Sequence, residues 1–210
     1  MLGSPAGGMA MHLEVLVEEL SAEAALSNIL PALLGQKHSF RIHPFRGKQD
    51  LLTNLPLRLS GYRSWIPEDW RIVVLVDRNG DDCRQLKNNL EAVAHGRHFH
   101  TGAGGMPFGL LNRIAVEELE AWFFGDVEAL REAYPRIPQT LEHRKGFRLP
   151  DRIQGGTWEQ LERILKAAGY YPTGMPKIQV ARDVSRHMRI DRNRSPSFQV
   201  FCAGVRGILT

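Results

Sequence analysis

Apolar and polar positions alternate over several short stretches of the chain, as is typical of β-strands. The segments HLEVLV at 12–17 and SFRIHP at 39–44 each predict one strand. The apolar run RIVVLV at 71–76 is rich in β-branched residues, which is typical of a parallel strand buried on both faces. Another strand is expected at 112–116. The pattern therefore predicts a sheet of about four strands.

Helical stretches separate these strands. One helix is expected to begin at Ser21, a preferred N-cap residue, and a second to cover 48–62, where Pro56 should bend it or start a new turn. A third is expected over 81–97. Strands that alternate with crossover helices predict an α/β fold with a mostly parallel sheet flanked by helices. In such folds, functional sites lie beyond the carboxyl ends of the strands.

The last part of the chain carries helix signals only. Thr157 and Gln160 form a capping-box pattern, and Pro176 suits the first position of a helix over 176–188. Ser195 followed by Pro196 predicts the start of a last helix. The chain is therefore expected to comprise a disordered leader or tag at 1–11, an α/β core at 12–134, a connecting segment at 135–156, and a basic helical extension at 157–210 that packs on the core.

Composition places the chain among ordinary globular proteins, and the charge distribution adds a hint of function. Hydrophobic residues make up 43% and charged residues 24%, which excludes a disordered or fibrous protein. No apolar run approaches the roughly 18 residues of a membrane helix, and two distant cysteines fit a reducing compartment, so a cytoplasmic protein without membrane contact is expected. Residues 1–138 carry a net charge of −3 and residues 139–210 one of +7, so a polyanionic partner would favour the later part.

Acidic residues follow three of the expected strands. The strand at 71–76 ends in the turn DRNGDDC, which brings Asp77, Asp81 and Asp82 close together. A hard cation such as Mg²⁺ or Mn²⁺ relieves such crowding because it prefers oxygen ligands. The alternative is that Asp81 caps the next helix and Asp82 favours its dipole, which explains two of the three acids without a metal.

The other two strands end in glutamates. Glu18 follows the first strand and is expected to meet Asp77 in space, although a glutamate in the first turn of a helix commonly does no more than stabilise that helix. Glu117, Glu118 and Glu120 lie at the last boundary, and their spacing allows only one or two of them to point inward.

Several segments together resemble a known fold. VEELSAE at 17–23, LVDRNGDDC at 75–83, RIAVEELEAWFFGD at 113–126, and KIQ with NRSPSF in the tail are similar to the Toprim-like (topoisomerase–primase) fold. Within that fold the chain resembles a bacterial family of domains of unknown function that is encoded beside ATPases. The resemblance implies that Glu18 is the acid after the first strand, Asp77 the first acid of an Asp-x-Asp pair, and Glu118 or Glu120 the later acid. The second aspartate of the pair is replaced by Asn79, which offers a carbonyl oxygen but no charge.

Basic residues of the tail are candidates for contact with nucleic acid. Arg182, Arg186 and Arg189 are spaced to share one helix face, with Lys177 and Arg194 nearby. The alternative is a solvated helix face whose charge neighbouring aspartates partly balance. The chain has no Gly-Lys-Ser/Thr phosphate loop, and GAGGMPFG at 102–109 lacks the spacing of a dinucleotide site.

Two main functions follow as hypotheses. In the first, the chain is a Mg²⁺-dependent phosphodiester hydrolase, nuclease-like, acting on nucleic acid in a bacterial defence module with an ATPase partner. Asp77 with Asp81 or Asp82 would anchor the ion, Glu18 would be general base or second ligand, and Glu118 or Glu120 would complete the shell. Lys177 and Arg182 would hold the phosphate. In the second, the chain is a non-catalytic adaptor for an ATPase. A nucleotide-phosphate binder or transferase is a third possibility.

Overall fold

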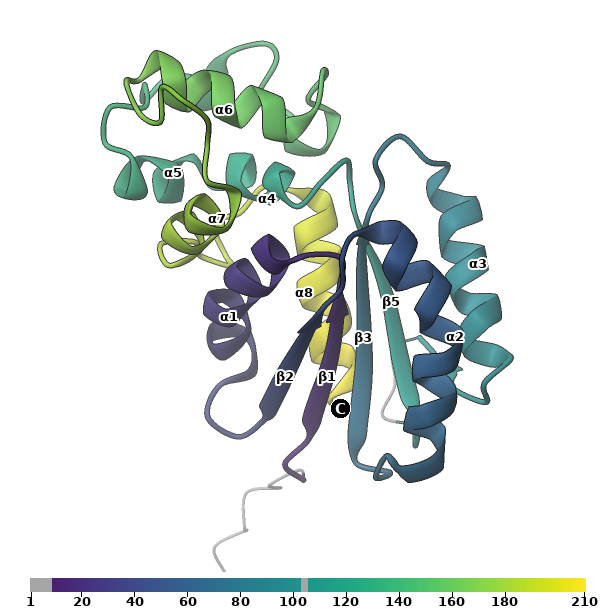
Figure 1. Cartoon of the computed structure of the whole chain (residues 1–210). Helices are drawn as coiled ribbons and strands as arrows, with labels where there is room; N and C mark the ends of the chain where they lie inside the picture. The colour runs from purple at the N-terminus through teal and green to yellow at the C-terminus, as the bar shows by residue number, and fades with distance from the viewer. Residues whose placement is uncertain (1–8, 103–105) are drawn as a thin grey trace, which may run out of the picture.

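The computed structural model describes residues 9–102 and 106–210 (Figure 1). Most of the expected leader at 1–11 and the centre of the glycine-rich segment at 102–109 therefore lie outside the described residues. Met11 is already part of the fold, because its amide donates a hydrogen bond of 3.1 Å to Nδ1 of His38.

A five-stranded parallel sheet organises the molecule, in the spatial order β2-β1-β3-β5-β4. The strands are β1 (His12–Val17), β2 (Ser39–Pro44), β3 (Trp70–Asp77), β4 (His100–Thr101) and β5 (Gly109–Ala115). The predicted α/β class with a parallel sheet is confirmed. The prediction of a strand at 112–116 was displaced by three residues at its start, and β4 was not foreseen because two residues carry no periodicity.

Alternation along each strand divides the core into two layers (Figure 1). Val15, Val73 and Leu111 belong to the cluster on the face that α1 (Leu20–Leu34) and α8 (Pro196–Ile208) cover. Leu16 and Val74 belong to the cluster beneath α2 (Lys48–Trp65) and α3 (Cys83–His95). Both faces of the sheet are thus covered by helices, as the β-branched composition of β3 predicts.

The first three helices follow the expected order but differ in their ends. The expectation of an N-cap at Ser21 was wrong, because α1 begins at Leu20 with Glu19 as its N-cap, and the Ser21 hydroxyl donates to Glu19 Oε1 instead. Pro56 lies inside one continuous helix, α2, and starts no new helix. Asp82, rather than Asp81, is the cap of α3, where it accepts the amide of Gln85 at 2.7 Å.

The remaining helices gather beyond the carboxyl ends of the strands and against α1 (Figure 1). They are α4 (Glu120–Gly125), α5 (Val127–Ala133), α6 (Thr157–Ala167) and α7 (Lys177–Ser185), with short 3-10 turns η1 (Leu141–His143) and η2 (Pro150–Arg152). Sequence periodicity did not predict α4 or α5, because α4 is buried along its whole length and shows no amphipathic pattern.

Caps in the tail are partly as expected. Ser195 caps α8 by accepting the amide of Phe198 at 3.2 Å, and Pro196 takes the first helical position, as predicted. The capping box at Thr157 was wrong, because Gly156 is the N-cap of α6 and Thr157 is its first residue. The helix predicted over 176–188 is shorter, since Pro176 is its N-cap and Ser185 its last residue.

Buried polar groups fix the tail against the core. Asn193 donates to the Trp122 carbonyl at 2.7 Å and accepts the Ser195 amide at 2.9 Å. Asp126, fully buried, accepts hydrogen bonds from the amides of Ala129 and Arg189 and from Nε of Arg192. Removing one member of such a network leaves a buried group without its partner, so the network also defines the position of the segment that carries α7.

Within the described residues, no helix combines the length and the apolar character that crossing a bilayer requires.

A pair of glycine substitutions tests this packing. A Cβ at Gly125, the last residue of α4, would lie 2.8 Å from Asn193 Cγ and 2.9 Å from the Ser195 amide nitrogen, and neither can yield without breaking the network. We expect Gly125→Ala to lower the free energy of unfolding by about 1–3 kcal/mol. Gly61→Ala, within α2 and facing open space, should instead raise it by about 0.5–1 kcal/mol. Urea denaturation checks both, and equal effects of the two changes would contradict the role given to Asn193.

Candidate functional site

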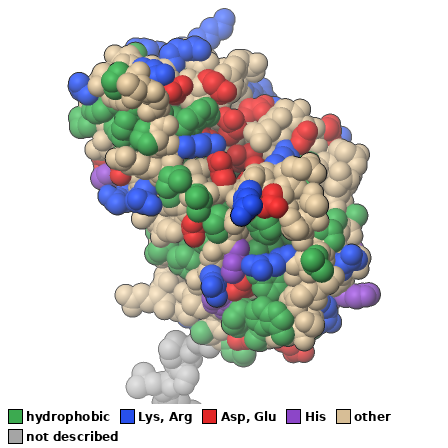
Figure 2. Space-filling model, viewed as in Figure 1, with side chains coloured by type: hydrophobic (Ala, Val, Ile, Leu, Met, Phe, Trp, Pro, Cys, Tyr) green, Lys and Arg blue, Asp and Glu red, His purple; other side chains and the backbone are tan. Residues whose placement is uncertain are grey.

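Four carboxylates and one lysine converge where the sheet meets the helical tail. Glu18 and Glu19 follow β1, Asp77 ends β3, Glu120 begins α4, and Lys177 begins α7. We call these five residues the acidic cluster. Because β1 and β3 are parallel neighbours, their carboxyl ends meet at one edge of the sheet, and β5 delivers the chain to α4 at the same edge. Figure 2 shows acidic side chains gathered in this region.

The two strand-end acids are joined directly. The Asp77 backbone amide donates a hydrogen bond of 2.7 Å to Oε1 of Glu18. Both side chains are nearly enclosed, with 7% of Glu18 and 9% of Asp77 exposed. The sequence-based expectation that the acids of the first and third strands meet in space therefore agrees with the geometry.

Glu120 is the most buried acid of the cluster. Only 1% of the residue is exposed, and neither carboxylate oxygen has a hydrogen-bond partner among the described residues. A buried carboxylate without donors is costly, because it has lost water and gained nothing equivalent. The nearest cation among the described residues is the ammonium of Lys177, whose Nζ lies 3.6 Å from Oε1.

Lys177 is the cation of the cluster. Its Nζ lies 2.5 Å from Oε1 of Glu19 and 5.2 Å from the centre of the Trp158 ring on α6. One ammonium therefore faces several carboxylates. The excess of negative charge must be relieved by protons or by a further cation.

The pKa values of the cluster follow from burial and crowding. Burial raises the pKa of Glu120 to about 7, although Lys177 opposes the rise. Burial, and then the charges of Glu120 and Glu18, raise the pKa of Asp77 well above its usual range. Burial also raises the pKa of Glu18. For Lys177, burial alone would lower the pKa, but Glu120 and Glu19 outweigh it and raise the pKa.

The other acids proposed from the turn lie outside the acidic cluster. Asp81 is half-exposed and pairs with Lys48 at 2.5 Å, while Asp82 is engaged as the cap of α3. Lys48 Nζ also donates to the carbonyls of Asp77 and Arg78, at 2.7 and 2.8 Å. Lys48 therefore fixes the backbone of the turn beside the cluster.

Glu117 and Asn79 complete the turn. Asn79 has a φ of 49°, a left-handed conformation that asparagine tolerates better than most residues. The backbone amide of Asn79 donates to the Glu117 carbonyl at 2.9 Å. The backbone amide of Gly80 donates to Oε2 of Glu117 at 3.0 Å. Arg78 forms an ion pair with the same carboxylate. Asn79 therefore has a conformational role in the turn that does not depend on binding a ligand.

Glu118 faces α6 rather than the cluster. Its Oε2 accepts the Thr157 hydroxyl at 2.7 Å and the Trp158 amide at 2.8 Å, so it serves as a cap for the first turn of α6. Of the glutamates at this boundary, Glu120 is therefore the one that the structure brings to Asp77.

The donor set fits a hard cation in chemistry, but the described residues do not form a ready-made site. Glu18, Asp77 and Glu120 offer carboxylate oxygens, two of which, both on Glu120, lack any hydrogen-bond donor. No group of three or more His, Cys, Asp or Glu side chains among the described residues is arranged to hold an ion. The position opposite Glu120 is taken by Lys177.

The basic residues of the tail do not share one helix face. Because α7 ends at Ser185, Arg189 lies beyond it and pairs with Asp191 at 3.3 Å. Arg194 pairs with Glu142 at 3.1 Å. Arg182 and Arg186 remain together at a groove of about 400 Å³ between α1 and α7, which Ser27 and Asn28 also line.

Sequence analysis missed two charged residues of this region. Glu19 reads as an ordinary acid at a helix start, and no local pattern links it to Lys177. Lys48 begins α2, and its contact with the turn after β3 depends on the pairing of β1 with both β2 and β3. The packing of α7 against α1 reveals the first contact, and the order of the strands reveals the second.

Comparison with known proteins gives one result. A family model described as a domain of unknown function, DUF4276, matches residues 17–206. No curated protein and no solved structure matches the chain significantly.

The raised pKa of Glu120 predicts a pH-dependent stability. Its folded-state pKa of about 7 lies above the ordinary value of 4.5, so the folded state binds more protons between these two pH values. The free energy of unfolding should therefore fall as pH rises through this window. We expect Glu120→Gln to make this fall smaller by on the order of 3 kcal/mol between pH 4.5 and 8, while the raised pKa values of Asp77 and Glu18 keep part of it.

Urea denaturation of both proteins at four pH values across that range measures the difference. Glu159→Gln, at an exposed position of α6, serves as the control and should leave the pH dependence of the wild type unchanged. A constant difference between wild type and Glu120→Gln would show that Glu120 titrates normally.

Proposed function

We propose that the chain, which belongs to the DUF4276 family of domains of unknown function, is a Toprim-like, Mg²⁺-dependent phosphodiester hydrolase acting on nucleic acid. The proposal includes an ATPase partner and a role in bacterial defence, both of which come from the resemblance of the sequence. The observation that carries the catalytic part is the pair of buried, unpartnered carboxylate oxygens of Glu120 beside Asp77 and Glu18.

Three residues would hold the ion: Glu18, Asp77 and Glu120. A bound Mg²⁺ would supply charge stabilisation for the phosphate and a more acidic water. Asp81, Asp82 and Glu118 are not included, because each has another partner in the structure.

Proton transfer falls to the same cluster. Glu120 binds the ion, and a carboxylate bound to a cation loses the raised pKa that burial gives it, so the proton of the attacking water would pass to Glu18 where Glu18 is not itself a ligand. Lys177, held cationic by Glu120 and Glu19, would neutralise charge that develops on the phosphate oxygens. Glu120 and Lys177 both lie at helix starts, and Lys177 is the more exposed of the two, so the phosphate would meet Lys177.

Nucleic acid would approach along α7. Arg182 and Arg186 are exposed and follow Lys177 on that helix and at its C-cap. Neither is engaged by a carboxylate closer than the 3.9 Å contact of Arg186 with Asp183. Charge contacts of this kind bind the backbone and give little sequence preference.

A second candidate is favoured by Lys177 itself. If the ammonium permanently replaces a metal ion, the cluster is a structural ion-pair network, and the chain is a non-catalytic adaptor for an ATPase. Asn79, which contributes no charge to the turn, agrees with that alternative.

Metal binding and nicking separate the two candidates. We expect calorimetric titration with Mg²⁺ or Mn²⁺ to show binding that Asp77→Asn and Glu120→Gln abolish, together with nicking of supercoiled plasmid that falls at least 100-fold in both variants. Asp82→Asn is the matched control, because asparagine can still cap α3 and the residue lies outside the cluster. Absence of binding and nicking in the wild type would favour the adaptor.

The salt dependence of DNA binding tests whether Arg182 and Arg186 contact nucleic acid. The double change Arg182→Gln and Arg186→Gln should weaken binding to duplex or single-stranded DNA and reduce the slope of log K against log salt by about 2. Arg194→Gln removes the same kind of charge from a residue paired with Glu142 and should change the slope little. Fluorescence anisotropy at several salt concentrations measures both, and identical slopes for all variants would exclude α7 as the contact surface.

A further inference from the structure

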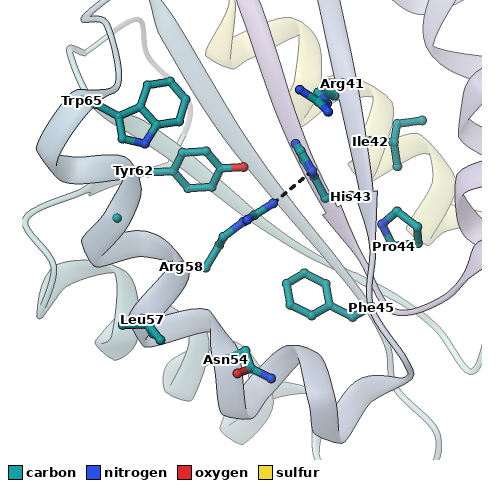
Figure 3. Close-up of a pocket in the computed structure, with 11 residues that line it drawn as sticks. Arg41, Ile42, His43, Pro44, Phe45, Asn54, Leu57, Arg58, Tyr62 and Trp65 are labelled. Atoms are coloured by element: carbon teal, nitrogen blue, oxygen red, sulfur yellow. Dashed lines mark hydrogen bonds between the residues drawn. The ribbon is translucent and has the colours of Figure 1, made fainter.

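A separate pocket of about 740 Å³ lies between the edge strand β2 and helix α2 (Figure 3). Arg41, His43 and Phe45 approach it from the strand, and Arg58, Tyr62 and Trp65 from the helix. Its volume is within the range of small-molecule sites. The pocket is on the α2 side of the sheet, whereas the acidic cluster faces α1 and α7.

The spacing of the sequence explains why these side chains face one another. Arg41 and His43 are two positions apart on a strand, so they share a face, and Phe45 continues it just past the strand end. Arg58, Tyr62 and Trp65 are four and three positions apart on α2, which places them on one helix face. β2 has a neighbour only at β1, so one side of the pocket is open.

A buried acid below the pocket fixes its polar wall. Glu14 on β1 is only 4% exposed and accepts hydrogen bonds from Nε2 of His12, Nε2 of His43 and the Tyr62 hydroxyl. The His43 contact is 2.5 Å long. These donors offset the negative charge of Glu14, so it repels an anion in the pocket less than a free carboxylate would.

The same network sets the tautomer of His43 and the position of Arg58. A guanidinium only donates, so Nδ1 of His43, 3.0 Å from Arg58, must be the acceptor, and Nε2 carries the hydrogen given to Glu14. Arg58 is also held by the Tyr62 ring, whose centre is 5.3 Å from Cζ. The guanidinium is thus preorganised, with further N–H groups available.

The pocket has cationic and aromatic groups but no carboxylate of its own. Arg41 is exposed and has no ion-pair partner among the described residues. Trp65 is 57% exposed, and Leu57, about two helical turns away on α2, is 76% exposed. An exposed tryptophan near two arginines favours a ligand that is flat and apolar at one end and anionic at the other.

We propose that this pocket binds a nucleoside monophosphate. Arg41 and Arg58 would bind the phosphate, and Trp65, at one end of the lining, would stack on the base (Figure 3). Glu14 and His43 are positioning residues, because they act on the phosphate through Arg58.

Calorimetry with AMP, GMP, CMP and UMP tests the proposal on the full chain at low salt. We expect a dissociation constant below 1 mM for at least one of them, at least tenfold weaker binding for Arg41→Gln and for Trp65→Ala, and no change for Arg46→Gln, an exposed arginine nearby that does not line the pocket. Both tested residues are exposed, so the variants should fold.

A comparison with the free nucleoside isolates the positioning role of Glu14. Glu14→Gln should weaken AMP binding while leaving adenosine binding unchanged, since only the phosphate depends on Arg58. An equal loss for both ligands would show a merely structural role for Glu14 and overturn this assignment.

Three results would overturn the proposal as a whole: no binding of any nucleotide at 10 mM, equal affinities for wild type and Arg41→Gln, or a dimer that Trp65→Ala dissociates, which would make the face a contact between copies. Tighter binding of a 5′-phosphorylated oligonucleotide than of AMP would identify a strand end, instead of a free nucleotide, as the ligand. Asp77→Asn should bind AMP normally, which keeps this test independent of the hydrolase proposal.

Discussion

The architecture of the candidate site depends on one electrostatic constraint, the burial of several carboxylates around the ammonium of Lys177. The carboxylate oxygens of Glu120 have no hydrogen-bond partner in the described part of the chain, and Asp77 and Glu18 are nearly enclosed, so the local environment is strongly biased against full ionisation. Lys177, even with Lys48 acting on Glu18, carries too little positive charge to neutralise four acids. This excess of carboxylates over lysines distinguishes the acidic cluster from an ordinary surface ion pair, and it suits the cluster to binding a cation or transferring a proton.

That constraint can be met only because distant segments are held firmly together. Lys177 is more than 150 residues from Glu18, and it reaches the cluster because α7 packs against α1 while Asp126 and Asn193 anchor the segment that follows α7. Trp158 on α6 contributes an aromatic face beneath the ammonium. The helical tail is therefore part of the site and not an accessory to the sheet.

The sequence predicted the fold class and part of the site, and the physical reasons for the limit are clear. The strands at 12–17 and 39–44 were located correctly because one face of each is apolar, and the meeting of Glu18 with Asp77 followed from parallel strand ends. The partners of Asp81, Asp82 and Glu118 were not predictable, because a capping acid and a ligand acid have the same sequence signature. Glu14 was also missed, since an acid within a strand normally faces solvent. Its role depends on two histidines and a tyrosine from three different elements.

The edge position of β2 has a consequence for self-association. The amides of Ser39 and Phe45 donate toward β1, at Met11 and Val17, so the intervening alternate residues direct their backbone groups outward. Pro44 is one of these, and it has no N–H to offer. A β-strand of another molecule that paired with β2 would lack one inter-strand hydrogen bond at Pro44, and the charge of Arg41 would further disfavour this pairing. The edge strand β2 therefore disfavours the successive strand pairing between molecules that would form fibrils.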